Sequence, residues 1–126
     1  MIALAGDQID GPFDGEEGIT LLADLDAGAI GCMPSAMIPE TIGQIVRRFL
    51  AGDREGAMAL YERYLPLINF ENRQCNLRAM KVLMAEGGII RSAHTRHPFL
   101  PLPEATRVGL LDLARRVDPL ILRWAH

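Results

Sequence analysis

The feature that most limits the fold of this chain is a change in the spacing of apolar residues near Pro39. Before this residue, short apolar runs alternate with glycine-rich turns, which is typical of alternating strands and helices. After it, apolar residues recur at helical spacing. Two candidate strands cannot form a stable parallel sheet alone, because their edges and one face would be uncovered. The sequence therefore predicts that these strands belong to a larger sheet.

The glycine-rich part predicts the order strand, helix, strand. We expect the first strand over residues 9–13, a helix over residues 17–27 that ends at Gly28, and the second strand over residues 29–33. The second strand is apolar on both faces, as a parallel strand covered by helices requires. This order fits the end of a (β/α)₈ barrel, which takes about 250 residues, roughly twice the length of this chain.

The remainder of the chain is expected to be helical. Pro39 suits the first position of a helix over residues 39–50, and Gly52 ends it. Asp53 is a candidate cap for the next helix, whose apolar stripe continues across Pro66, where we expect a kink or a break. Two more helices are predicted around residues 77–84 and 110–117, separated by a proline-rich connection.

Composition limits the classes of partner. The chain of 126 residues is 49% hydrophobic, which is ample for a core, and its 13 basic and 16 acidic residues give a net charge of -3. This balance gives no reason to expect nucleic acid or an anionic membrane as a partner. No apolar run approaches the roughly 20 residues that span a bilayer. Cys32 and Cys75 lack a metal-type spacing and the N-terminus lacks a signal-peptide pattern, so we expect a cytoplasmic protein.

Several short motifs follow one another along nearly the whole chain. They are FDGEEG at 13–18, LDAGAIGCMPS at 25–35, PE at 39–40, AGD at 51–53, LPL at 65–67 and RHPFLPL at 96–102. Their order and spacing resemble the last two barrel strands and the C-terminal helices of the dihydrodipicolinate synthase and N-acetylneuraminate lyase family. Residues 28–40 lack the asparagine that many synthases and lyases carry before the proline. This run looks more like the branch that acts on sugar-acid derivatives, including keto-deoxy sugar acid dehydratases.

The resemblance implies an α/β fold that is mostly helical by content. Residues 1–52 would be the C-terminal part of a TIM barrel, with its last two strands, and residues 53–126 a C-terminal helical region. Family members are class I aldolases or dehydratases without a cofactor, in which a lysine forms a Schiff base with a 2-keto acid and a tyrosine passes protons.

The catalytic residues of this family are expected to lie outside this chain. Lys81, the one lysine, resembles a C-terminal family lysine that stands outside the active centre. The Schiff-base lysine and the proton-relay tyrosine belong to upstream strands of the family fold. We therefore expect the chain to be a piece of the enzyme that is inactive alone. The alternative is a non-catalytic helical interaction module derived from the same fold.

The candidate site residues follow the two predicted strands, because barrel sites form where strands end. They are Gly15, Glu16 and Glu17 after the first strand, and Met33, Pro34 and Ser35 after the second. Their expected role is to bind a 2-keto acid. Alternatives are acidic residues at a helix N-terminus for Glu16 and Glu17, core packing for Met33, and a loop role for Ser35.

Other chemistry-bearing residues have structural interpretations. The acidic residues between positions 7 and 17 fit no EF-hand spacing, so we expect no metal site. Tyr61 and Tyr64 lie on one helical stripe and are predicted core or interface residues, and Cys32 is predicted to be an inert thiol. Because the barrel strands would leave an open face, we expect a homo-oligomer or association through these strands.

Overall fold

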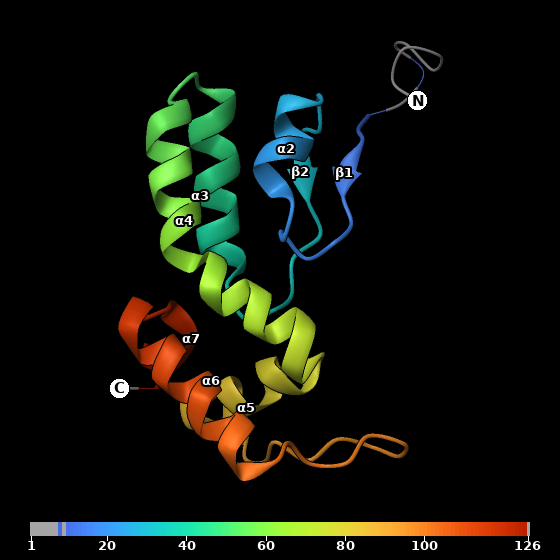
Figure 1. Ribbon diagram of the computed structural model, residues 1–126, viewed down its shortest axis with the longest axis vertical. Helices are drawn as coiled ribbons and strands as arrows, with labels where there is room; N and C mark the ends of the chain where they lie inside the picture. Colours follow the sequence, from blue (N-terminus) through green and yellow to red (C-terminus); the bar gives the residue numbers. More distant parts are fainter. Residues whose placement is uncertain (1–7, 9, 126) are drawn as a thin grey trace.

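The structure, a computed structural model, describes residues 8 and 10–125 and is mostly helical (Figure 1). Its elements in chain order are β1 (Phe13–Asp14), α2 (Leu21–Asp26), β2 (Gly31–Cys32), α3 (Pro39–Leu50), α4 (Arg54–Phe70), the π-helix η2 (Glu71–Cys75), α5 (Arg78–Glu86), α6 (Glu104–Val117) and α7 (Leu120–Arg123). In Figure 1, β1, β2 and α2 lie beside the hairpin of α3 and α4, and α5, α6 and α7 gather at the other end of the molecule.

The two strands pair in parallel, as predicted. Phe13 is opposite Gly31 and Asp14 is opposite Cys32. Two backbone hydrogen bonds flank these pairs, from Ile30 N to Pro12 O at 3.0 Å and from Met33 N to Asp14 O at 2.8 Å. The strands are shorter than the predicted ranges 9–13 and 29–33, and residue 9 lies outside the described residues. Each strand has one hydrogen-bonded neighbour among the described residues, which limits the ladder.

The absence of a side chain at Gly31 lets the Phe13 ring of β1 lie close to β2. A Cβ atom at this position would come within 2.6 Å of the Phe13 ring, which lies across the glycine. The Phe13 side chain is nevertheless 52% exposed. The pairing of the two strands therefore leaves a large apolar group at the surface.

The predicted helix over residues 17–27 is wrong in its first turn, because α2 begins only at Leu21. The backbone is left-handed at Glu17 (φ 58°) and Gly18 (φ 90°), which no helix accommodates. The end of this helix is as expected, since the left-handed Gly28 (φ 100°) follows the C-cap residue Ala27.

Helices α3 and α4 follow the predicted boundaries. Pro39 occupies the first helical position of α3, and the left-handed Gly52 (φ 87°) follows its end. The Asp53 carboxylate accepts a hydrogen bond from Gly56 N at 3.0 Å, which confirms the predicted cap. The chain stays helical through Pro66, so the kink rather than the break is found: α4 changes direction in Figure 1.

One continuous core joins the two parts of the chain. Fully buried residues come from every region, including Leu21, Ile45, Leu67, Leu83 and Leu110. Burying each such side chain contributes about 1.5–3 kcal/mol relative to its exposed state. The apolar helix faces predicted from the sequence therefore pack into one core.

Tyr61 and Tyr64 are buried against this core, as predicted. Tyr61 Oη donates to the Ile19 carbonyl, and Tyr64 Oη donates to the Val117 carbonyl at 3.1 Å. Buried phenols need such partners. Through them, α4 is bound to the turn before α2 and to the end of α6.

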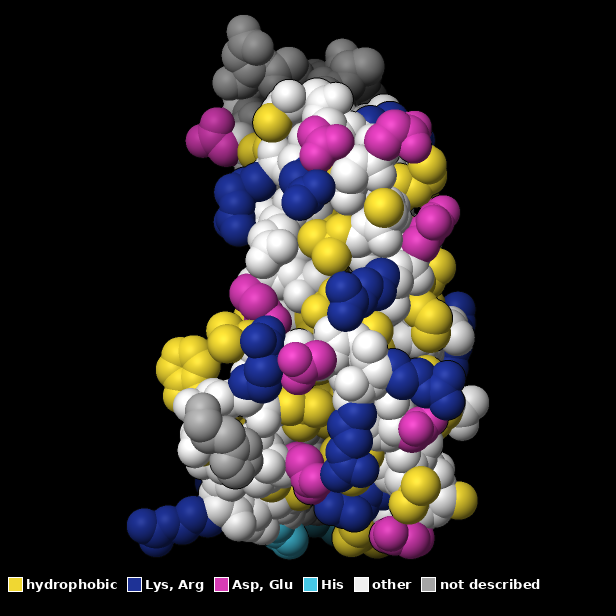
Figure 2. Space-filling view, turned by 90° about the vertical axis from the view of Figure 1, so that its left-hand side faces the viewer, with side chains coloured by type: hydrophobic (Ala, Val, Ile, Leu, Met, Phe, Trp, Pro, Cys, Tyr) yellow, Lys and Arg dark blue, Asp and Glu magenta, His cyan; other side chains and the backbone are white. Residues whose placement is uncertain are grey.

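Basic and acidic side chains are interspersed over the face seen in Figure 2. Several form exposed pairs, such as Arg116 with Asp112 at 2.8 Å and Arg54 with Asp26 at 2.7 Å. Exposed pairs of this kind contribute about 0–1 kcal/mol each. Among the residues that the structure describes, no helix combines the length and apolar character needed to cross a bilayer.

Candidate functional site

The turn after β1 is organised by the Asp14 carboxylate. Asp14 is buried and accepts hydrogen bonds from Glu16 N at 2.9 Å and from Gly18 N at 3.0 Å. The Cys32 thiol of β2 donates to the same carboxylate at 3.0 Å. These three donors hold residues 15–17 in a fixed turn and replace the first turn of the expected helix.

Cys32 has no catalytic activation. Burial raises the pKa of its thiol, and the hydrogen bond to the Asp14 carboxylate raises this pKa further. A thiol is a nucleophile only as thiolate, so these surroundings keep Cys32 unreactive. The prediction of an inert thiol agrees with this geometry.

Gly15, Glu16 and Glu17 line one hollow of about 350 Å³. Its other wall comes from η2, with Asn72 and Arg73. The helix N-terminus interpretation of Glu16 and Glu17 is wrong, because the first turn of α2 lies later in the chain. The turn after β1 thus faces the C-terminal helices across a small polar hollow.

The residues after β2 lie next to this turn. The Met33 methyl group is 3.4 Å from where a Cβ of Gly15 would stand, so the two strand ends converge. Core packing for Met33 is wrong, since its side chain is 61% exposed. Ser35 Oγ accepts a hydrogen bond from Met37 N at 3.0 Å, which gives Ser35 a role in the loop. Pro34 and Ser35 are partly buried and do not line the hollow.

Glu71, the first residue of η2, was not among the predicted site residues. Its side chain is 1% exposed, and its Oε1 atom has no hydrogen-bond partner. Burial raises the pKa of this carboxyl to about 7, and repulsion by Glu17 adds to the rise. Glu71 is therefore a buried acid with an unpartnered oxygen. Nothing in its sequence neighbourhood signals this, because a glutamate at the end of a helix is usually solvated.

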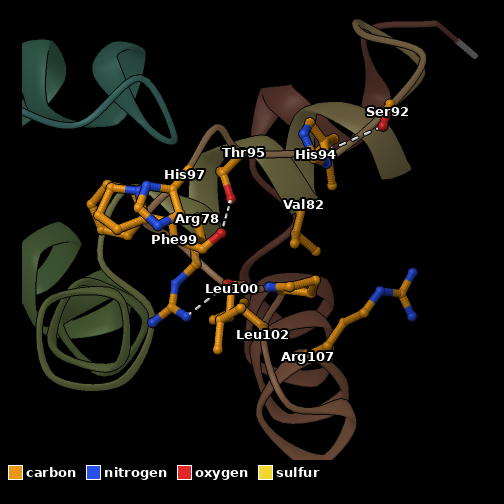
Figure 3. A pocket seen from close by; sticks show the side chains of 13 residues that line it. Arg78, Val82, Ser92, His94, Thr95, His97, Phe99, Leu100, Leu102 and Arg107 are labelled. Carbon is orange, nitrogen blue, oxygen red and sulfur yellow. Dashed lines mark hydrogen bonds between the residues drawn. The ribbon is translucent and has the colours of Figure 1, made fainter.

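A larger hollow of about 520 Å³ lies between α5, the loop over residues 92–102 and α6 (Figure 3). Its cations are already engaged: Arg78 donates to the Leu100 carbonyl at 3.0 Å, and Arg107 pairs with Glu86 at 3.4 Å. His94 and His97 also line it. This hollow lies away from the ends of β1 and β2, so we do not assign the candidate site there.

Lys81 belongs to this distal region. It lies on α5, which packs against α6 and α7, and its Nζ donates to the His94 carbonyl. Within the described part of the chain, no three His, Cys, Asp or Glu side chains are grouped to hold a metal ion.

Comparison with known proteins identifies the family of the chain. The sequence profile of the Dihydrodipicolinate synthetase family matches residues 12–116. The chain belongs to this family. The match includes both strands and the helices through most of α6, so the resemblance in the motifs is confirmed.

Two relatives in the dihydrodipicolinate synthetase family show how much of their length this chain matches. The L-2-keto-3-deoxyarabonate dehydratase of Azospirillum brasilense is 52% identical over 126 residues, which is 100% of this chain and 41% of the relative. The 4-hydroxy-tetrahydrodipicolinate synthase of Sorangium cellulosum (strain So ce56) is 32% identical over 105 residues, covering 82% of this chain and 35% of that protein.

A solved member of the family shares the fold. The dihydrodipicolinate synthase from Rhodopseudomonas palustris superimposes with a TM-score of 0.74 at 28% identity, covering 81% of this chain and 34% of that one. The chain thus has the fold of part of this TIM-barrel family. It spans about two fifths or less of the length of these relatives.

Asp14→Asn is expected to lower the free energy of unfolding by about 2 kcal/mol, because hydrogen bonds to a charged acceptor contribute about 1.5–3 kcal/mol. The amide has one acceptor oxygen, whereas the carboxylate serves Glu16 N, Gly18 N and the Cys32 thiol. Urea unfolding measures the change. Asp10→Asn removes the same charge at an exposed position and should change stability by less than about 0.5 kcal/mol. Equal effects of the two substitutions would contradict the role of Asp14.

Proposed function

We propose that this chain forms part of a family lyase that acts on a 2-keto acid derived from a sugar acid. In this proposal, β1 and β2 are the last two barrel strands, within residues 1–52, and residues 53–126 form the C-terminal helical region. The observation that carries it is the convergence of the loops after both parallel strands, where Met33 meets Gly15. Barrel sites form at such strand ends. The name of the A. brasilense relative supports a keto-deoxy sugar acid as substrate.

The proposed role of these loops is to bind the substrate. Glu16 and Glu17 are exposed at the hollow and would accept hydrogen bonds from sugar hydroxyl groups, while the acid group of the substrate would avoid them. Arg73 lines the same hollow and is the cation suited to a carboxylate. Gly15 leaves room for close approach, and Met33 offers an apolar contact. Ser35, set back from the hollow, and Pro34 would hold the shape of the second loop.

The covalent step is proposed to depend on residues outside this chain. A Schiff base requires a deprotonated lysine that is poised at the substrate carbonyl. Lys81 instead donates to the His94 carbonyl on α5, in the distal region. Tyr61 and Tyr64 are buried and bonded to backbone carbonyls, which leaves neither as a proton relay at the hollow. The family's lysine and tyrosine would come from other barrel strands.

The exposed strand face is the proposed place of association. Phe13 and Met33, on one side of the paired strands, are 52% and 61% exposed, and β1 pairs only with β2 among the described residues. An exposed apolar face beside an open strand edge favours pairing with further strands. We propose that other barrel strands cover this face, in the intact barrel or through association of copies.

A chimera tests the proposed function. This chain would replace the 41% of the A. brasilense dehydratase that it matches. We expect the chimera to dehydrate 2-keto-3-deoxyarabonate, and Glu16→Ala within it to lower kcat/KM about 10-fold, which corresponds to a loss of about 1.4 kcal/mol. Glu62→Ala, at an exposed position of α4, is the matched control. A folded chimera without activity, or equal effects of both substitutions, would contradict the proposal.

The isolated chain is expected to form no Schiff base. Mixed with pyruvate and borohydride, it should show no covalent adduct by mass spectrometry, because a covalent mechanism without its nucleophile retains little rate. An adduct on Lys81 would show that the amine of this chain is competent and would overturn the assignment of the covalent step to other strands.

A further inference from the structure

The hollow between α5, the loop over residues 92–102 and α6 has no part in the proposed function. Its volume of about 520 Å³ lies within the range of small-molecule sites, about 300–1,000 Å³. Most of its lining residues are apolar, among them Val82, Phe99, Leu100 and Leu102 (Figure 3), and the described residues that line it include no Asp or Glu. An apolar hollow of this size with a few polar groups is the usual form of a ligand site.

The loop that forms one side of this hollow is held by its own hydrogen bonds. It belongs to the connection over residues 87–103, which has no helix or strand, and connections longer than about 12–15 residues often serve binding. Thr95 is buried and donates its hydroxyl to the Phe99 carbonyl at 3.3 Å. Lys81 of α5 donates to the His94 carbonyl. The walls of the hollow are therefore kept in place by the protein itself.

Arg78 places a positive charge at the wall of this apolar hollow. Its Nε donates to the Cys75 carbonyl and its Nη1 to the Leu100 carbonyl, each at 3.0 Å. Carbonyl groups orient a guanidinium without neutralising it, and none of the ion pairs among the described residues includes Arg78. Three of its five N–H groups have no hydrogen-bond partner within the described part of the chain. The cation is thus fixed in direction and open to an anion.

The second arginine of the hollow is neutralised by its own neighbours. Arg107 lies 3.4 Å from Glu86 Oε2 and 3.9 Å from Glu104 Oε1. In Figure 3, Arg78 and Arg107 lie on opposite sides of Val82. The uncompensated charge of Arg78 therefore stands at one side of an apolar space. This arrangement is complementary to a molecule that has a carboxylate at one end and an apolar body, because a guanidinium matches a carboxylate.

We propose that this hollow binds small molecules that combine one carboxylate with an apolar chain or ring. The carboxylate would accept hydrogen bonds from the free N–H groups of Arg78, and the apolar part would lie against Val82 and Leu102. Leu100, which is 76% exposed beside Arg78, would then lose contact with water. A hydroxylated keto acid fits poorly, because its hydroxyl groups would lose water against an apolar wall. The site goes beyond the proposed function and uses none of the candidate site residues.

Titration of the 126-residue chain with octanoate, octanol and pyruvate tests this inference. Binding would be followed by carbon-13 nuclear magnetic resonance of the Val82 and Leu102 methyl groups, which line the hollow. The Met33 methyl, on the exposed strand face, reports non-specific contact. We expect octanoate to shift the Val82 and Leu102 signals with a dissociation constant about 10-fold below that of octanol, because only octanoate offers a charge to Arg78. Pyruvate, which lacks an apolar body, should leave these signals in place.

Arg78→Gln separates the charge from the apolar wall. This variant should weaken octanoate binding about 10-fold and change octanol binding less than about 2-fold. Arg47→Gln removes an exposed charge of α3 and should change neither. Because Arg78 also holds the Leu100 carbonyl, Arg78→Lys is a second variant that keeps the charge, and it should still bind octanoate more tightly than octanol.

Three results would overturn the inference. They are equal affinity of the wild type for octanoate and octanol, shifts confined to Met33, and no shift with octanoate at millimolar concentration. If Arg78→Gln loses both ligands, the preference for octanoate in the wild type and in Arg78→Lys decides. None of these readouts depends on enzymatic activity, so failure of this inference is distinguishable from failure of the chimera.

Discussion

Glu71→Gln is expected to raise the free energy of unfolding at pH 8 by about 3 kcal/mol. Burial raises the pKa of Glu71 from 4.5 to about 7 in the folded protein. Each pKa unit corresponds to about 1.4 kcal/mol of differential stability. At pH 8 the wild-type carboxyl is ionised in both states, and its charge is unfavourable only in the folded one. The neutral amide removes this unfavourable charge and keeps the size of the side chain.

The pH window of this effect follows from the direction of the shift. The folded state binds the proton of Glu71 more tightly than the unfolded state, so its stabilising contribution is complete below pH 4.5. It is lost as the pH rises to about 7 and stays absent above that value. In urea titrations, the difference in free energy of unfolding between wild type and Glu71→Gln should therefore grow as the pH rises through this range. Glu62→Gln, at an exposed position, should change stability by less than about 0.5 kcal/mol. A constant gap from pH 4 to pH 8 would contradict the raised pKa.

The helices could be read from the sequence because their signals are local. Pro39 begins α3, Gly52 ends the run, and Asp53 caps α4, and each acts within one turn of its own position. The parallel pairing of β1 and β2 was also predictable, since a strand that is apolar on both faces indicates a covered parallel sheet. The four-residue helix α7 was not predicted, because so short a segment has no periodicity to read.

The candidate site was only partly predictable, because much of it depends on contacts between segments that are far apart in the sequence. Gly15 and Met33 follow strands, so their convergence could be expected from the barrel pattern. The left-handed turn at Glu17 depends on a carboxylate four residues from Gly18 and on a thiol from β2, which no periodicity reports. The burial of Glu71 depends on the packing of η2 with α4, α5 and α6. Contacts between distant segments have no signature in one sequence.

Gly87→Ala is expected to lower the free energy of unfolding by about 3 kcal/mol, through a clash that undocks α7. Gly87 caps α5 with an ordinary φ of -80°, so alanine meets no backbone strain there. Its Cβ, however, would overlap the Ile121 carbonyl oxygen and stand 3.2 Å from the Leu122 Cα. These are backbone atoms, which cannot rotate away, so α7 must move and expose Ile121, now 5% exposed.

Gly52→Ala is the matched control for this clash, because this position combines a strained backbone with free space for a Cβ atom. Gly52 has a left-handed φ of 87°, and a Cβ atom there would meet nothing within 4 Å. Its expected loss is therefore conformational only, about 1–2 kcal/mol. Urea unfolding with tryptophan fluorescence from Trp124, directly after α7, would report global stability and local undocking together. If Gly87→Ala were no more destabilising than Gly52→Ala and left the Trp124 emission unchanged, the close docking of α7 on the end of α5 would be wrong.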